Sequence, residues 1–361
     1  MLALFMLEFF YEYGLFLAKT LTILFSVLVV VGLILSMQQR GRRDDSGHLE
    51  VINLNERLQR STDILKQAIL SPQALKLEQK AKKKIDKETA KAEKKAYVSG
   101  DENQRARLFV LDFVGDLQAS AVAALREEVT AVLEVATAED EMLIRLESPG
   151  GLVHSYGLAA SQLRRVRDRG VRLTVAVDNV AASGGYMMAC IADRIVAAPF
   201  AVLGSIGVAA QVTNVHNLLK KNDVEVDVLT AGDYKRTLTT FGENTEAGRA
   251  KFVEELEDVH TLFKDFVAEN RADLAVDEVS TGEAWYGTRA LERNLVDELQ
   301  TSDEFIVGRC ADYDVFSVRF IENKTRVDKL LDQFAAGIRS AAGAMGSVPR
   351  LLFRNPTRGV Q

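Results

Sequence analysis

The sequence has few of the residues on which several classes of functional site depend. Among 361 residues there are two cysteines, Cys190 and Cys310, which excludes a framework of disulfides. No pair of cysteines and histidines has the spacing of zinc ligands. The four histidines are scattered, so a mechanism that depends on histidine has few candidates. The net charge of −6 argues against nucleic acid as the main partner, because such proteins usually present a basic face. A zinc enzyme, a disulfide-stapled domain and a nucleic-acid-binding protein are therefore not expected.

One long apolar run stands near the N-terminus. Residues 15–37 contain a single charged residue, Lys19, and from Thr20 to Met37 the run has no charge at all. At 1.5 Å per residue such a helix is long enough to span the hydrocarbon core of a bilayer, about 30 Å thick. A cleaved signal peptide would have a basic start and a shorter apolar run, whereas acidic residues precede this one. We predict a short N-terminal tail at 1–14 and an uncleaved transmembrane helix at 15–37.

The segment after this run has a different composition. Ser71-Pro72 has the form of a helix N-cap followed by proline at the first helical position. Residues 74–96 are rich in Lys, Glu, Gln and Ala and contain neither glycine nor proline. Lysines and acids alternate there at helical spacing, and a short amphipathic segment near Leu49 precedes them. We interpret residues 38–105 as a charged helical spacer between the membrane and a folded domain.

Strand and helix patterns alternate from residue 106 onward, which predicts crossover units and parallel sheets. Several predicted strands are short and only a few residues apart, which favours a spiral of ββα units over a wide doubly wound sheet. We therefore predict an α/β domain at 106–305, then a C-terminal strand and a basic amphipathic tail at 306–361. The expected strands are 108–115, 142–148, 171–179, 194–199, 205–212 and 224–230, and the expected helices are 119–136, 153–168, 214–220 and 246–271.

Two strand ends carry paired glycines that suit acyl chemistry. Ser148-Pro149-Gly150-Gly151 closes one strand, and adjacent glycines leave backbone N–H groups free for an oxyanion. In Ala181-Ala182-Ser183-Gly184-Gly185 a strand leads into a helix, which places the Ser183 hydroxyl at the positive end of the helix dipole. The alternatives are a plain turn for the first motif and a helix-capping serine for the second.

A base for such a serine has two candidates. Lys235, in Gly232-Asp233-Tyr234-Lys235-Arg236, follows the predicted strand at 224–230, and serine–lysine pairs are a known form of nucleophile and base. Most lysines are surface residues, so this motif alone does not select Lys235. His154 is the one histidine near a glycine motif, but an isolated histidine is more often structural.

Taken together and in this order, these motifs resemble the bacterial SohB/SppA family of membrane-bound serine peptidases. The resemblance covers roughly residues 105–305, and one core copy after a single apolar run and a long spacer looks like the SohB branch. It departs from the family at Asn294, where the family usually has glycine; asparagine tolerates the left-handed helix cap better than other non-glycine residues. The matching segments are ESPGG (147–151), DNVAASGGYMMACIADRIVA (178–197), LGSIGV (203–208), AGDYKR (231–236) and TRALERNLVDEL (288–299).

The resemblance implies a ClpP/crotonase-like spiral of ββα units and a serine endopeptidase with a Ser-Lys dyad. Ser183 would be the nucleophile and Lys235 the base, the amides of Gly151 and Gly184 would hold the oxyanion, and Ser205 would orient the lysine. It implies no metal and no organic cofactor. Substrates would be unstructured or signal-peptide-derived peptides, and the partners would be the bilayer and further copies in a homo-oligomer. Whether the dyad lies within one chain or across two stays open.

Localisation follows from the same resemblance, as a single-pass protein of the bacterial inner membrane. Arginines after the apolar run place the domain in the cytoplasm by the positive-inside rule, whereas the family's association with exported peptides favours the periplasm. We favour the cytoplasm on the sequence's own charges, and protease digestion in spheroplasts discriminates the two. The basic tail would lie on an anionic bilayer or pack between subunits.

Two other functions share some of these features. A crotonase-type acyl-CoA enzyme has the same fold and a glycine oxyanion hole, but the predicted anchor and the serine at 183 argue against it. Binding of a CoA thioester would identify it. A non-catalytic membrane scaffold, in which Ser183 only caps a helix, would not react with a serine-directed probe.

Overall fold

A computed structural model of the chain describes residues 11–26, 47–99 and 105–322. The chain divides into two units, one at 49–321 and one containing 1–48 and 322–361. In the second unit residues 11–26 are helical. Within the described residues, no helix combines the length and apolar character that crossing a membrane requires. Part of the predicted span, 27–37, and the predicted tail after 322 lie outside the described residues.

The larger of two sheets confirms a mixed α/β fold. Its strand order is β1-β10-β2-β3-β4-β6-β9, and every pairing from β10 to β9 is parallel. Side chains such as Leu111, Ile144 and Val175 lie in register on neighbouring strands and are fully buried, as expected where helices cover a parallel sheet. The strands are β1 (Gly47–Asn53), β2 (Arg107–Val114), β3 (Glu141–Glu147), β4 (Arg172–Val177), β6 (Arg194–Ala197), β9 (Glu298–Leu299) and β10 (Asp314–Glu322).

The smaller sheet holds the segments that carry the glycine motifs. It consists of β5 (Val180–Ala182), β7 (Val202–Gly204) and β8 (Ala284–Tyr286), in that order. The chain passes from β4 directly into β5 and from β6 directly into β7, so each of these two successive units supplies one strand to each sheet. β5 and β7 are parallel, with Ala182 opposite Gly204. The residues that follow these two strands therefore emerge side by side at one edge of the small sheet.

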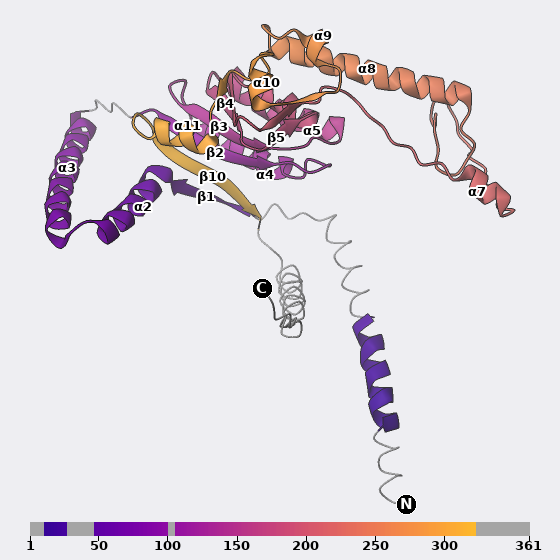
Figure 1. Ribbon diagram of the computed structural model, residues 1–361, viewed down its shortest axis with the longest axis horizontal. Helices are drawn as coiled ribbons and strands as arrows, with labels where there is room; N and C mark the ends of the chain where they lie inside the picture. The colour runs from indigo at the N-terminus through magenta and orange to yellow at the C-terminus, as the bar shows by residue number, and fades with distance from the viewer. Residues whose placement is uncertain (1–10, 27–46, 100–104, 323–361) are drawn as a thin grey trace, which may run out of the picture. The chain divides into compact units, whose positions relative to one another are not determined.

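Helices pack on the large sheet and complete the core (Figure 1). The principal ones are α4 (Val122–Val135), α5 (Val153–Asp168) and α6 (Gly184–Ala189), and α8 (Glu246–Asn270) packs outside them against α6. Shorter helices are α7 (His216–Lys221), α9 (Val276–Val279), α10 (Gly287–Leu291) and α11 (Ser302–Arg309). Asn294, just after α10, has φ 59°, which confirms the left-handed conformation expected at this position.

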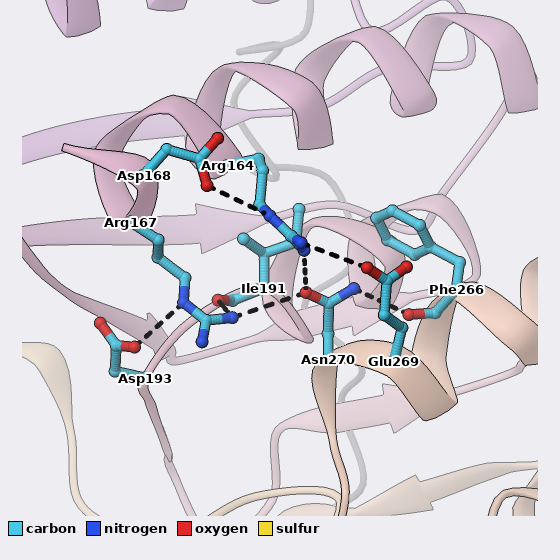
Figure 2. A network of polar contacts seen from close by, with 8 residues as sticks. All are labelled: Arg164, Arg167, Asp168, Ile191, Asp193, Phe266, Glu269 and Asn270. Carbon is cyan, nitrogen blue, oxygen red and sulfur yellow. Dashed lines mark hydrogen bonds and ion pairs between the residues drawn. The ribbon is translucent and has the colours of Figure 1, made fainter. Parts of the chain in front are cut away.

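A polar network fixes the C-terminal end of α8 on α5 (Figure 2). Arg164 donates to the Asn270 side chain at 2.7 Å and pairs with Glu269 at 3.2 Å. Arg167 donates to the Ile191 carbonyl at 3.0 Å and pairs with Asp193 at 3.0 Å. These contacts anchor only the last turn of α8, and the helix leads away from the sheets at its other end.

Most predicted elements are confirmed, but two predicted strands are wrong. Residues 205–212 and 224–230 contain no strand. Alternating valines at 224, 226 and 228 are typical of a strand, yet a strand needs a neighbour to accept its backbone hydrogen bonds, and no described residue provides one. Residues 207–245, which we call the arm, are instead exposed or half-buried, apolar side chains included. Gly242 is their one buried residue. In Figure 1 the arm, with α7, lies at the end of α8 remote from the two sheets.

The predicted spacer contains two helices and one unexpected strand. α2 (Leu54–Ile69) and α3 (Pro72–Ser99) are helices as predicted, and the Ser71 side chain accepts from Ala74 N–H. The amphipathic segment expected near Leu49 begins as the strand β1, which pairs with the edge of β10, and continues into α2. The Asn55 side chain joins α2 to the main domain by accepting from Val315 N–H at 2.7 Å.

One buried carboxyl makes stability depend on pH. Glu128 on α4 is 4% exposed and accepts from Phe320 N–H at 2.8 Å. Burial raises the pKa of Glu128 from 4.5 to about 7, with Asp112 adding to the rise and the Phe320 hydrogen bond opposing it.

We expect stability to fall as pH rises through the window between those two pKa values. The folded state binds more protons there than the unfolded state, so Glu128 lowers the free energy of unfolding by on the order of 2–3 kcal/mol across it. Glu128→Gln keeps an acceptor for Phe320 and removes the titration. Urea unfolding at about pH 5 and pH 8 should show a smaller pH dependence in the variant; parallel changes in both proteins would contradict the assignment.

Candidate active site

Ser183 stands in a strained backbone conformation between β5 and α6. Its φ of 52° and ψ of −116° lie where few non-glycine residues are found, and such strain persists only where surrounding contacts enforce it. The Ser183 N–H donates to the Gly204 carbonyl at 2.8 Å, and the Ser183 carbonyl accepts from Met187 N–H as α6 begins. The side chain is half-buried. The fold therefore presents this hydroxyl at the start of a buried helix.

The first glycine motif packs directly against Ser183. A Cβ placed on Gly150 would lie 2.7 Å from the Ser183 Cβ and 2.9 Å from the Gly184 nitrogen, so no side chain fits there. Gly150 also has φ +91°, which glycine adopts without strain. Ser148 holds the two segments together: its N–H donates to Val180 at 2.8 Å and its carbonyl accepts from Ala182 N–H at 3.0 Å.

Two backbone donors remain free beside the serine. Neither Gly151 N–H nor Gly184 N–H donates a hydrogen bond to any residue in the described part of the chain. Gly184 follows Ser183 directly. Gly151 follows Gly150, the glycine in contact with Ser183. Gly151 is itself packed on Leu117, because a Cβ there would lie 2.2 Å from the Leu117 carbonyl oxygen. Free N–H groups at a nucleophile are what stabilisation of an oxyanion requires.

A buried tyrosine that the sequence analysis did not single out joins these parts. Gly150 N–H donates to the Ser148 hydroxyl at 3.1 Å, which lies 2.5 Å from the Tyr156 phenolic oxygen. Tyr156 in turn donates to the Asp116 carbonyl at 2.8 Å. The Tyr156 ring also lies against Gly184, where a Cβ would come within 2.4 Å of Cγ. The Tyr156 side chain thus contacts Ser148, which holds the turn that precedes Gly151, and also contacts Gly184.

The protonation of Tyr156 suits this role. Burial raises the pKa of the Tyr156 phenol, and the hydrogen bond with Ser148 offsets part of the rise. The phenol therefore stays protonated near neutral pH and keeps donating to Asp116. No sequence motif could have found Tyr156, since it lies on a helix face among other apolar positions.

The remaining predicted site residues lie in different places. Ser205, at φ 49°, follows Gly204 and so lies beside Ser183, but its hydroxyl donates to the Gly282 carbonyl at 3.3 Å. His154 is exposed on α5. Lys235 is exposed on the arm, and the described residues contain no hydrogen bond between it and Ser183. The structure thus brings together Ser183, Gly184, the Gly150-Gly151 turn and Ser205, and does not bring Lys235 to them.

A metal centre is not formed by the residues described. Within 11–26, 47–99 and 105–322, no three His, Cys, Asp or Glu side chains are grouped so that they could hold an ion.

Comparison with known proteins gives two family profiles that together span most of the chain. The profile of the peptidase family S49 N-terminal region matches residues 8–163, and that of peptidase family S49 matches residues 165–311. Probable protease SohB of Haemophilus influenzae is 51% identical over 88% of this chain and 90% of its own. Probable protease SohB of Buchnera aphidicola subsp. Schlechtendalia chinensis is 46% identical over 84% of this chain and 100% of its own.

Among solved structures, a mutant 1510-N membrane-bound stomatin-specific protease in complex with a substrate peptide is similar at a TM-score of 0.39. It is 12% identical and covers 64% of this chain and 98% of its own. A likeness at this level carries no argument about function.

Proposed function

This chain belongs to peptidase family S49, and from that premise we propose that it is a serine endopeptidase with Ser183 as its nucleophile. The observation that supports this most directly is the strained Ser183 held against a glycine turn, with two free amides beside it. We also assign the two linked sheets to the ClpP/crotonase-like spiral, since the β4–β5 and β6–β7 units each give one strand to each sheet.

The proposed reaction is acyl transfer in two steps. Neutral Lys235 takes the proton of the Ser183 hydroxyl, whose oxygen attacks the peptide carbonyl carbon while Gly151 and Gly184 N–H groups donate to the developing oxyanion. Lys235 then returns the proton to the leaving amine as the peptide bond breaks. Water attacks the acyl-enzyme with Lys235 again as base, which releases the acid product and restores Ser183. The substrates we propose are unstructured or signal-peptide-derived peptides.

Assembly of the dyad calls for a second copy of the chain. Lys235 is exposed on an arm that contains unpartnered apolar side chains, Leu229 among them at 92% exposed. Exposed apolar surface of this kind is typical of an interface that another subunit covers. We propose a closed homo-oligomer in which the arm of one copy brings Lys235 to Ser183 of its neighbour. Burial there would also exclude water from the lysine.

Anchoring in the bacterial inner membrane through residues 15–37 completes the proposal. Its support is the charge-poor run itself, together with the family resemblance. The test of the enzymatic part is hydrolysis of an unstructured peptide by the full chain. Binding of a CoA thioester without peptide hydrolysis would favour an acyl-CoA enzyme instead.

Removing the Tyr156 hydroxyl is expected to slow this reaction. Tyr156→Phe keeps the ring against Gly184 but leaves the Ser148 hydroxyl, which accepts from Gly150 N–H, without its fixed partner, so the oxyanion donors lose alignment. We expect kcat to fall by about tenfold to a hundredfold with little change in KM, because alignment matters most in the transition state. Steady-state hydrolysis of a peptide measures both constants.

Tyr186→Phe is the matched control. Tyr186 is another fully buried tyrosine. Its hydroxyl donates to the Leu295 carbonyl at 3.0 Å and not to the segment that holds the Gly150-Gly151 turn. Its loss should lower the unfolding temperature by a similar amount and leave kcat near that of the wild type. Equal kcat in the two variants would show that Tyr156 has no special role in the site.

A further inference from the structure

One face of α3 carries a continuous row of lysines. Successive residues of an α-helix are rotated by about 100° around its axis. At that rotation six of these lysines fall within an arc of about 100°, which places them on one face of the helix. All six side chains are exposed. We call them the lysine face; they are Lys76, Lys80, Lys83, Lys84, Lys87 and Lys91.

The opposite face of α3 is the one that meets α2. Glu78 forms an ion pair with Lys66 of α2, and Lys82 pairs with Asp63 of α2 at 2.6 Å. Glu78 and Lys82 are one turn apart and point about 180° away from Lys80 at the helical spacing. Packing on α2 therefore leaves the lysine face pointing outward, except that Lys83, at its margin, also lines the cleft between the two helices.

The lysines of this face have no ion-pair partner in the described part of the chain. Across the described residues, none of the six lysines forms an ion pair with an acid. The whole chain carries a net charge of −6, whereas α3 has nine lysines against four acids. Like charges one turn apart destabilise a helix, so such a row has a cost unless an anionic surface faces it.

We infer that the lysine face docks α3 on an anionic lipid bilayer. The row is straight and runs about 22 Å from Lys76 to Lys91 at 1.5 Å per residue, which suits a flat charged surface. The helix contains no arginine, the residue that recognises individual phosphates by paired hydrogen bonds, so its charge acts as a field. Leu77, 70% exposed, borders the row and can enter the interface. The apolar run at 15–37 of the same chain is of membrane-spanning length. The inference does not depend on peptidase activity.

The test measures amide hydrogen exchange of residues 72–99 in the full chain reconstituted into vesicles. Vesicles of phosphatidylcholine alone are compared with vesicles that also contain phosphatidylglycerol. We expect exchange in α3 to slow by about tenfold on the anionic vesicles and to return to the faster rate at high salt. Comparing the two lipids within each variant removes effects of the substitutions on the helix itself.

Two sextuple variants separate charge from side-chain identity. Replacing the six lysines with glutamine should abolish the difference between the lipids, and replacing them with arginine should preserve it. Equal exchange on both vesicles in the wild type, or a difference that survives in the glutamine variant, would overturn the inference. Stronger protection by added RNA than by anionic vesicles would instead assign the face to nucleic acid, and would also overturn it.

Discussion

Ser183→Ala and Lys235→Ala are each expected to reduce peptide hydrolysis by roughly three to five orders of magnitude while the chain stays folded. The alanine at 183 removes the atom that forms the acyl-enzyme, and the alanine at 235 removes the group that accepts its proton. Because the two side chains act as one unit, the double variant should be hardly slower than either single variant. Release of a fluorophore from a quenched, unstructured peptide measures the loss.

Matched controls replace an exposed serine and an exposed lysine outside the proposed site. Ser161→Ala alters an exposed serine of α5, and Lys220→Ala alters an exposed lysine of the arm. Both should hydrolyse the peptide at close to the wild-type rate. Retention of most activity in Lys235→Ala would show that the proposed dyad is wrong, and His154 would become the leading candidate for the base.

Mixing the two inactive variants during assembly is expected to restore part of the activity. In a shared site, some interfaces of a mixed oligomer pair an intact Ser183 from a Lys235→Ala chain with an intact Lys235 from a Ser183→Ala chain. With random mixing of equal amounts, about a quarter of the interfaces would be complete, so activity should return to about a quarter of the wild-type value. The gain over either variant alone would be several hundredfold or more.

The mixing experiment needs proof that the two variants assemble together. Differently tagged chains that co-purify provide it, and mixing after separate assembly serves as the negative control. A mixture that stays inactive despite co-assembly would place both residues of the dyad within one chain. The arm would then have to fold back on its own subunit, and only the weaker proposal of a homo-oligomer would remain.

Much of the domain could be predicted because its patterns are local. The buried strand β3 and the helix α5 were expected at 142–148 and 153–168 and are found at Glu141–Glu147 and Val153–Asp168. The family was predicted from five motifs, and the comparisons confirm it. The valines at 224–228 have the pattern of a strand but do not form one, because the pattern is local whereas a strand also requires a partner.

The geometry of the site was less predictable than its residues. Gly150 rather than Gly151 is the glycine in contact with Ser183, a matter of turn conformation that glycine spacing does not encode. Tyr156 was missed because its role depends on packing against Gly115 and Gly184, where added side chains would lie within 2.4 Å of it. Such contacts follow from the crossing of two helices and a turn, and no short motif reports them.

The most direct test of the account is to label the full chain with a fluorophosphonate probe and locate the adduct by peptide mass spectrometry. The probe reacts with a serine whose proton is removed and whose developing anion is stabilised, so it tests Ser183 without knowledge of the natural substrate. We predict one adduct, on Ser183, that is absent in Ser183→Ala and much slower to form in Lys235→Ala. Labelling at another serine, or no labelling of an assembled and folded wild-type chain, would contradict the account.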